Sequence, residues 1–127
     1  MFSPEEFNEI IRKAEQGDKN AQNKLYNYGL ALRRGVHKNL QKAIEVWRKA
    51  VDFDIPEAAG NLAELYENGS NDTGDNKIEP NIKEAAKYYS IAADILEKML
   101  ESNQLANEAD VQNTIKFYRE KAAYMAK

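Results

Sequence analysis

The side chains that could carry out catalysis or hold a transition metal are few in this sequence. His37 is the one histidine, and the chain has no cysteine. A catalytic base or a metal-ligating histidine acts together with partner side chains, and no second imidazole or thiolate is present to join His37. Because it lies two residues after Gly35, where a helix is expected to end, we expect His37 in an exposed loop.

A cluster of carboxylates offers a second kind of chemistry. Asp72, Asp75 and Glu79 lie in one short segment, and carboxylate oxygens are the ligands that calcium prefers. The EF-hand calcium loop requires a central glycine and a final glutamate, but Lys77 and Lys83 stand at those positions when the count starts at Asp72. We therefore predict a solvated loop without a metal ion.

No other pattern in the sequence indicates an enzyme. There is no glycine-rich phosphate loop of the Walker or Rossmann type and no nucleophile elbow. The remaining carboxylates are spread along expected helix surfaces, where solvated side chains are the ordinary explanation. We predict a non-catalytic protein that has no cofactor and no metal site.

Composition limits the class of protein and of partner. The 127 residues are 43% hydrophobic and 31% charged, which is typical of one globular domain rather than a disordered chain. The net charge of −3 argues against nucleic acid as the main ligand and favours a neutral or basic partner. The sequence begins without a basic segment followed by an apolar run, and no apolar run is long enough to cross a bilayer. We expect a cytoplasmic protein that does not bind a membrane.

The spacing of apolar residues predicts helices almost throughout. Ser3, Pro4 and Glu6 form a helix-initiating pattern, and Asn39, Asp54 and Asn81 are expected to cap later helices. The expected helices run from Ser3 to about residue 16, and then over about residues 20–34, 40–52, 55–68, 82–100 and 107–126. Residues 69–80 form the one long irregular stretch, and we expect its shortening to be tolerated.

The chain repeats itself within these helices. Residues 21–53 align with residues 58–94, and the offset grows from 37 positions in the first helix to 42 in the second because the irregular stretch is inserted between them. The aligned pairs are Ala21 with Ala58, Leu25 with Leu62, Ala43 with Ala85, Val46-Trp47 with Tyr88-Tyr89, and Ala50-Val51 with Ala92-Ala93.

These positions resemble the Sel-one-like repeats, which are relatives of the tetratricopeptide repeats. The second unit matches the family pattern with Ala58, Leu62, Tyr66, Gly69, Ala85, Tyr88, Tyr89, Ala92 and Ala93. Departures include Ala63 and Tyr26 where the family prefers glycine, Gly29 where it prefers an aromatic residue, and Asp54 where it has a closing glycine. The resemblance covers about residues 14–94.

The resemblance implies an all-α fold, a right-handed superhelical stack of antiparallel helix hairpins with about six helices. The 127 residues would form one domain. Within it we expect an N-terminal capping helix (1–17), a first repeat (18–53), a second repeat (54–94), and a C-terminal extension with a capping helix (95–127).

Proteins similar to this one often hold a protein partner on the concave side, which the first helix of each hairpin lines. The non-core positions of those helices predict a protein-binding surface made of Asn23, Asn27, Tyr28, Arg34, Asn61, Glu64 and Asn68. For Tyr28 the alternative is packing against the first helix. We therefore predict a protein-interaction module. The alternative is a bacterial immunity or antitoxin-type protein that neutralises a cognate toxin or effector domain.

Overall fold

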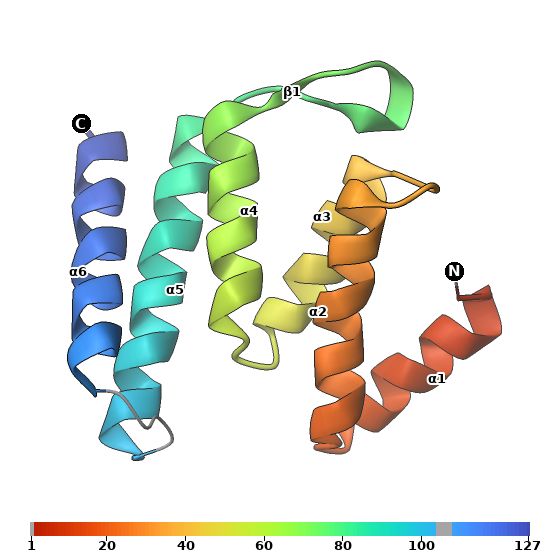
Figure 1. Cartoon of the computed structure of the whole chain (residues 1–127), viewed down its shortest axis with the longest axis horizontal. Helices are drawn as coiled ribbons and strands as arrows, with labels where there is room; N and C mark the ends of the chain where they lie inside the picture. The colour runs from red at the N-terminus through yellow and green to blue at the C-terminus, as the bar shows by residue number, and fades with distance from the viewer. Residues whose placement is uncertain (1, 104–107) are drawn as a thin grey trace.

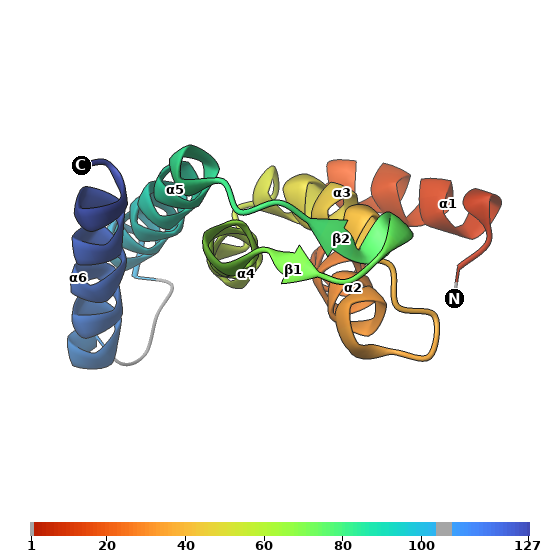
Figure 2. The same cartoon turned by 90° about the horizontal axis from the view of Figure 1, so that it is seen from above.

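The computed structural model describes residues 2–103 and 108–127, and it confirms the predicted all-α fold. Successive helices run up and down, so that each lies antiparallel to the next (Figure 1). Seen from above, α2 and α4 form one row and α1, α3 and α5 the other, with α6 beside α5 at the end of the stack (Figure 2). The helices are α1 (Pro4–Glu15), α2 (Lys19–Arg34), α3 (Leu40–Val51), α4 (Pro56–Asn68), α5 (Ile82–Glu101) and α6 (Glu108–Met125).

Short polar side chains start most of these helices, as their sequence predicts. The Ser3 hydroxyl accepts a hydrogen bond from the backbone N–H of Glu6 at 3.1 Å, and the Glu6 carboxylate accepts one from the Ser3 N–H, which completes a capping box. The side chains of Asn39 and Asn81 likewise accept backbone hydrogen bonds at the starts of α3 and α5. These two asparagines occupy equivalent places in the repeat, so the same side chain starts the second helix of each hairpin.

The predicted cap of α4 by Asp54 is wrong. The cap residue is Ile55, and no side chain bonds to the first turn of α4. Asp54 instead has a φ of +59°, in the left-handed region that glycine favours and that aspartate tolerates better than most residues. Its carboxylate pairs with Lys98 on α5 at 2.9 Å. Asp54 therefore makes the turn at the position where the Sel-one-like repeats, which the sequence resembles, have a glycine.

Trp47 fills the centre of the first hairpin. Its side chain is completely buried, and its indole N–H donates a hydrogen bond to the backbone carbonyl of Tyr26 at 3.2 Å. The ring lies against Gly29 so closely that an added Cβ at this glycine would be 2.1 Å from the indole nitrogen. Gly29, a departure from the family pattern, thus makes the space that Trp47 occupies.

A second aromatic contact packs together the two helices of the second hairpin, and Arg48 connects it to the first hairpin. Tyr66 on α4 stacks on Tyr88 on α5, with ring centroids 6.0 Å apart and ring planes 9° from parallel. Arg48 on α3 donates a hydrogen bond to the Tyr66 hydroxyl and lies over its ring. Burial raises the pKa of Tyr66, and this effect outweighs the positive charge of Arg48, which acts to lower the pKa. The phenol therefore stays neutral at physiological pH.

The stretch between α4 and α5 is mostly exposed, as expected, but it is regular and not an irregular loop. It forms a short antiparallel hairpin of β1 (Ser70–Asn71) and β2 (Lys77–Ile78) around a 3-10 turn, η1 (Gly74–Asn76). The hairpin reaches back over the amino end of α3 (Figure 1).

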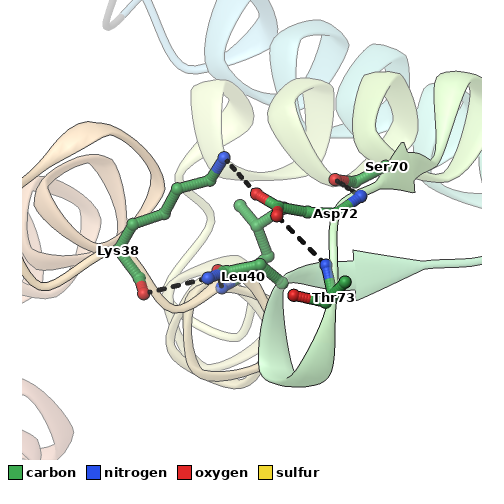
Figure 3. Close-up of polar contacts among 6 residues, drawn as sticks. Lys38, Leu40, Ser70, Asp72 and Thr73 are labelled. Carbon is green, nitrogen blue, oxygen red and sulfur yellow. Dashed lines mark hydrogen bonds and ion pairs between the residues drawn. The ribbon is translucent and has the colours of Figure 1, made fainter.

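Polar contacts hold this hairpin on the first repeat. The Asn76 side chain accepts from the Leu40 N–H at 2.9 Å and donates to the Lys38 carbonyl at 3.3 Å. Lys38 reaches across to Asp72 at 3.2 Å (Figure 3). Ile78 is only 4% exposed and joins the core. The hairpin is therefore a second connection between the repeats, and shortening residues 70–77 would remove these contacts.

The fit between Trp47 and Gly29 can be tested with a double-mutant cycle. We expect Trp47→Ala to lower the free energy of unfolding by about 3–5 kcal/mol, because a large buried ring is lost. Gly29→Ala should cost about 1–3 kcal/mol in the native background, because its methyl group overlaps the indole. In the Trp47→Ala background the same change should be neutral or stabilising, because alanine favours the helix and the space is now empty. Chemical denaturation measures all four proteins; a Gly29→Ala cost that is equal in both backgrounds would contradict this packing.

The hairpin's contribution to the stability of the fold depends on the two hydrogen bonds of Asn76. We expect Asn76→Ala to lower the free energy of unfolding by about 1–2 kcal/mol, since the Leu40 N–H loses its partner at the start of α3. Asp75→Ala is the matched control in the same turn, and it should change stability by less than about 0.5 kcal/mol because Asp75 is exposed. Equal effects of the two substitutions, measured by urea denaturation, would show that the hairpin does not support α3.

Candidate protein-binding surface

A groove lies between α4 and α6, next to α5. Its formation depends on Gly60 of α4, because an added Cβ there would lie 2.6 Å from the hydroxyl of Tyr118 of α6. The groove has a volume of about 370 Å³. We call it the α4–α6 groove, and its lining residues are Gly60, Glu64, Glu67, Asn68, Tyr89, Phe117, Tyr118 and Lys121.

A charged hydrogen-bond cluster forms one side of the groove and joins three helices. Glu67 of α4 accepts from the Tyr89 hydroxyl of α5 at 2.6 Å and from the Lys121 ammonium of α6 at 2.7 Å. Burial acts to raise the pKa of Glu67, but these two bonds outweigh it and leave that pKa below its ordinary value. Burial, and then the bond to Glu67, raise the pKa of Tyr89. Each carboxylate oxygen of Glu67 has a partner, so this cluster fixes α6 on the stack.

The other side of the groove is aromatic, exposed and acidic. The Phe117 side chain is 53% exposed and lies 5.7 Å from the Tyr118 ring. Burial raises the pKa of Tyr118, and the negative charges of Glu57 and Glu64 add to that rise. Glu64 is half exposed, and its one ion pair, with Arg33 of α2, is long at 3.5 Å. The exposed Phe117 ring and the weakly paired Glu64 carboxylate therefore line the same groove.

The structure distributes the predicted site residues over different parts of the surface. Glu64 and Asn68 line the α4–α6 groove. Asn23 lines a separate groove beside the Asp54 turn, and Asn27 lines a third groove at the N-terminal end of the stack. Arg34 is exposed at the end of α2. The seven predicted residues therefore do not form one continuous concave site.

Two of the predicted residues connect α2 to α4. The half-buried Asn61 side chain donates to the Tyr26 hydroxyl at 3.3 Å, and Glu64 meets Arg33. These side chains are at the junction of the two helices that were expected to line the partner site. Asn61 is already partly occupied by a contact within the chain.

The prediction of Tyr28 as an exposed anchor is wrong, and its alternative is correct. Tyr28 is only 7% exposed. Its ring meets Phe2 and Phe7 edge to face, with centroid distances of 5.0 and 5.8 Å. These contacts join α2 to the first helix and the residues before it, and the edge-to-face geometry is favourable for aromatic rings.

Sequence reasoning missed most of the groove, including the part that α6 supplies. The residues missed are Glu67, Tyr89, Phe117, Tyr118 and Lys121. Adjacent residues of one helix cannot both point into a core, so the aromatic pair at positions 117 and 118 indicates an exposed ring on the last helix. The prediction of a capping helix there did not include this ring.

The other candidate residues show no catalytic or metal-binding arrangement. His37 is exposed in the turn between α2 and α3, as expected. Asp72 is engaged with Lys38 and with the Thr73 N–H (Figure 3). In residues 2–103 and 108–127, no three acidic or histidine side chains gather in a way that could hold a metal ion. Within those same ranges, no helix is both long enough and apolar enough to span a bilayer.

Comparisons of the chain with protein-family models, with characterised proteins and with solved structures find no match. The resemblance to Sel-one-like repeats therefore stays a prediction that rests on the residues quoted above.

The Glu67 cluster predicts a pH dependence of stability. The folded-state pKa of Glu67 lies below the ordinary value of 4.5, so its contribution is complete above about pH 4.5 and is lost as the pH falls through the folded-state pKa. We expect Glu67→Gln to cost about 1–2 kcal/mol at pH 7, and this difference from the native protein should shrink below pH 4.5. Thermal denaturation across pH 3–7 measures the difference, with Glu101→Gln, at the exposed end of α5, as a control that should stay near zero. A Glu67→Gln cost that is constant over this range would contradict the assigned charge interaction.

Proposed function

We propose that this protein is a non-catalytic interaction module that binds a basic segment of a protein partner in the α4–α6 groove. The observation that carries the proposal is that the exposed Phe117 ring and the Glu64 carboxylate line the same groove. Large exposed aromatic side chains in a concave surface are typical anchors of protein interfaces.

The groove offers each contact that such a segment needs. An arginine or lysine of the partner can lie over Phe117 while its charge approaches Glu64. The exposed Asn68 side chain can donate to and accept from a peptide backbone. The net charge of −3 attracts a basic partner from a distance.

The scaffold around the groove supports binding without rearrangement. Tyr118 is held against Gly60, and the bonds of Glu67 to Tyr89 and Lys121 fix α6 relative to α4 and α5. A groove that exists before binding loses little conformational entropy when the partner arrives. This favours recognition of a partner that fits the groove as it stands.

The proposal can be tested by affinity capture followed by a direct binding measurement. The tagged native protein should retain a partner from native lysate at stoichiometric amounts, and mass spectrometry identifies it. With that partner purified, Phe117→Ala and Glu64→Lys should each weaken binding by about tenfold or more. Binding should also weaken as the salt concentration rises, because the charges are exposed.

Two matched controls separate the groove from the rest of the surface. Tyr124→Ala removes another exposed aromatic ring of α6, and Glu15→Lys reverses another exposed charge. Both variants should bind as the native protein does. If all four variants bind equally, the groove is not the interface. A partner that proves to be a toxin domain would identify the immunity-type protein that the sequence offered as the alternative.

A further inference from the structure

Another groove lies at the other end of the stack. Its volume is about 600 Å³, within the range of about 300–1,000 Å³ that small-molecule sites occupy. α1 diverges from α2 toward its own amino terminus, so α1 does not cover the upper part of α2 (Figure 1). We call this the N-terminal groove, and its apolar wall consists of Phe2, Tyr28, Ala31, Leu32 and Val36.

The turn after α2 presents an unusual apolar side chain at the edge of this groove. Val36 is 98% exposed. The turn is closed by bonds from the Gly35 N–H to the Ala31 carbonyl at 2.6 Å and from the Lys38 N–H to the Gly35 carbonyl at 3.1 Å. Gly35 is required for this closure, since an added Cβ would lie 2.4 Å from the Ala31 oxygen. The turn therefore holds Val36 beside the groove instead of letting it fold into a core.

The ionisable side chains that line the groove are basic. Lys24 and His37 line it together with the Asn27 amide, and no carboxylate does. Among the residues that the structure describes, Lys24 makes no ion pair with an acidic side chain. An apolar wall with an unpaired cation at its edge complements a ligand that has an apolar body and an anionic end.

We propose that the N-terminal groove binds an amphiphilic carboxylate, a small molecule with an unbranched alkyl chain. The alkyl chain lies along the wall between Phe2 and Val36, and the carboxylate pairs with Lys24 and accepts a hydrogen bond from Asn27. This site is separate from the α4–α6 groove, and it does not depend on the function proposed for that groove.

Titration with decanoate, followed by two-dimensional amide NMR of the native protein, tests the site. We expect saturable shifts confined to Phe2 and residues 24–37. Affinity should rise from hexanoate through octanoate to decanoate, by up to about fourfold for each methylene. Decan-1-ol has the same chain without the charge, and it should bind about threefold to tenfold more weakly than decanoate.

Substitutions test which side chains contact the carboxylate of the ligand and which contact its alkyl chain. Lys24→Gln should remove the preference for decanoate over decanol, while Lys83→Gln, the same change on an exposed lysine of α5, should preserve it. Ala31→Glu places a carboxylate in the groove at an exposed helical position that accepts glutamate, and it should weaken decanoate binding by more than tenfold. Ala123→Glu on α6 is its control and should bind normally.

Three results would overturn the proposal. The first is the absence of saturable shifts with decanoate, and the second is shifts centred outside Phe2 and residues 24–37. The third is equal binding of decanoate and decan-1-ol by the native protein, which would remove the role of Lys24. Circular dichroism of each variant confirms that it folds, so that a loss of binding reports on the groove.

Discussion

The placement of the Trp47 indole against the backbone of Gly29 is the contact on which the stack depends. A helical hairpin cannot bury its apolar face alone, so each hairpin needs a close and well-shaped contact within itself and with the next. Trp47 supplies the first, because it is fully buried and its one polar group is satisfied by the Tyr26 carbonyl. Alanines that are completely buried along α3, α4 and α5 then let the neighbouring helices approach. The Tyr66–Tyr88 pair packs α4 against α5, and Arg48 of α3 bonds to Tyr66 and so joins the two hairpins. The two rows of helices in Figure 2 follow from these contacts.

A stack this short has two ends, and both proposed binding surfaces arise at them. At the C-terminal end α6 covers α5 but leaves the Phe117 ring half exposed beside α4. At the N-terminal end α1 covers the start of α2 through Phe7 and Tyr28, and then diverges from it (Figure 1). The chemical character of each groove depends on the side chains at its edge.

The two grooves differ in charge, and this separates the ligands that they suit. Glu64 and Glu67 line the C-terminal groove, and Glu64 is only weakly paired, whereas Lys24 and His37 line the N-terminal one. Charge of opposite sign at the two ends opposes binding of one ligand at both sites, because each groove repels what the other attracts. The hairpin over α3 adds rigidity between them, since Asn76 ties the loop of one repeat to the first turn of the other.

The sequence by itself determined the helices, their caps and the repeat. These features depend on spacing and on local hydrogen bonds, as the capping box of Ser3 and the caps of Asn39 and Asn81 show.

Tertiary structure decided what depends on residues far apart in the chain. Asp54 could be recognised as a turn residue, but only the packing of α4 and α5 shows that it forms a left-handed turn and pairs with Lys98. Tyr28 was ambiguous because exposure depends on where α1 lies, and residues 69–80 gave no local sign that Asn76 would bond across 36 positions to Leu40. The α4–α6 groove was missed for the same reason: its walls come from three helices, and the sequence pattern of one helix does not indicate which neighbour it will meet.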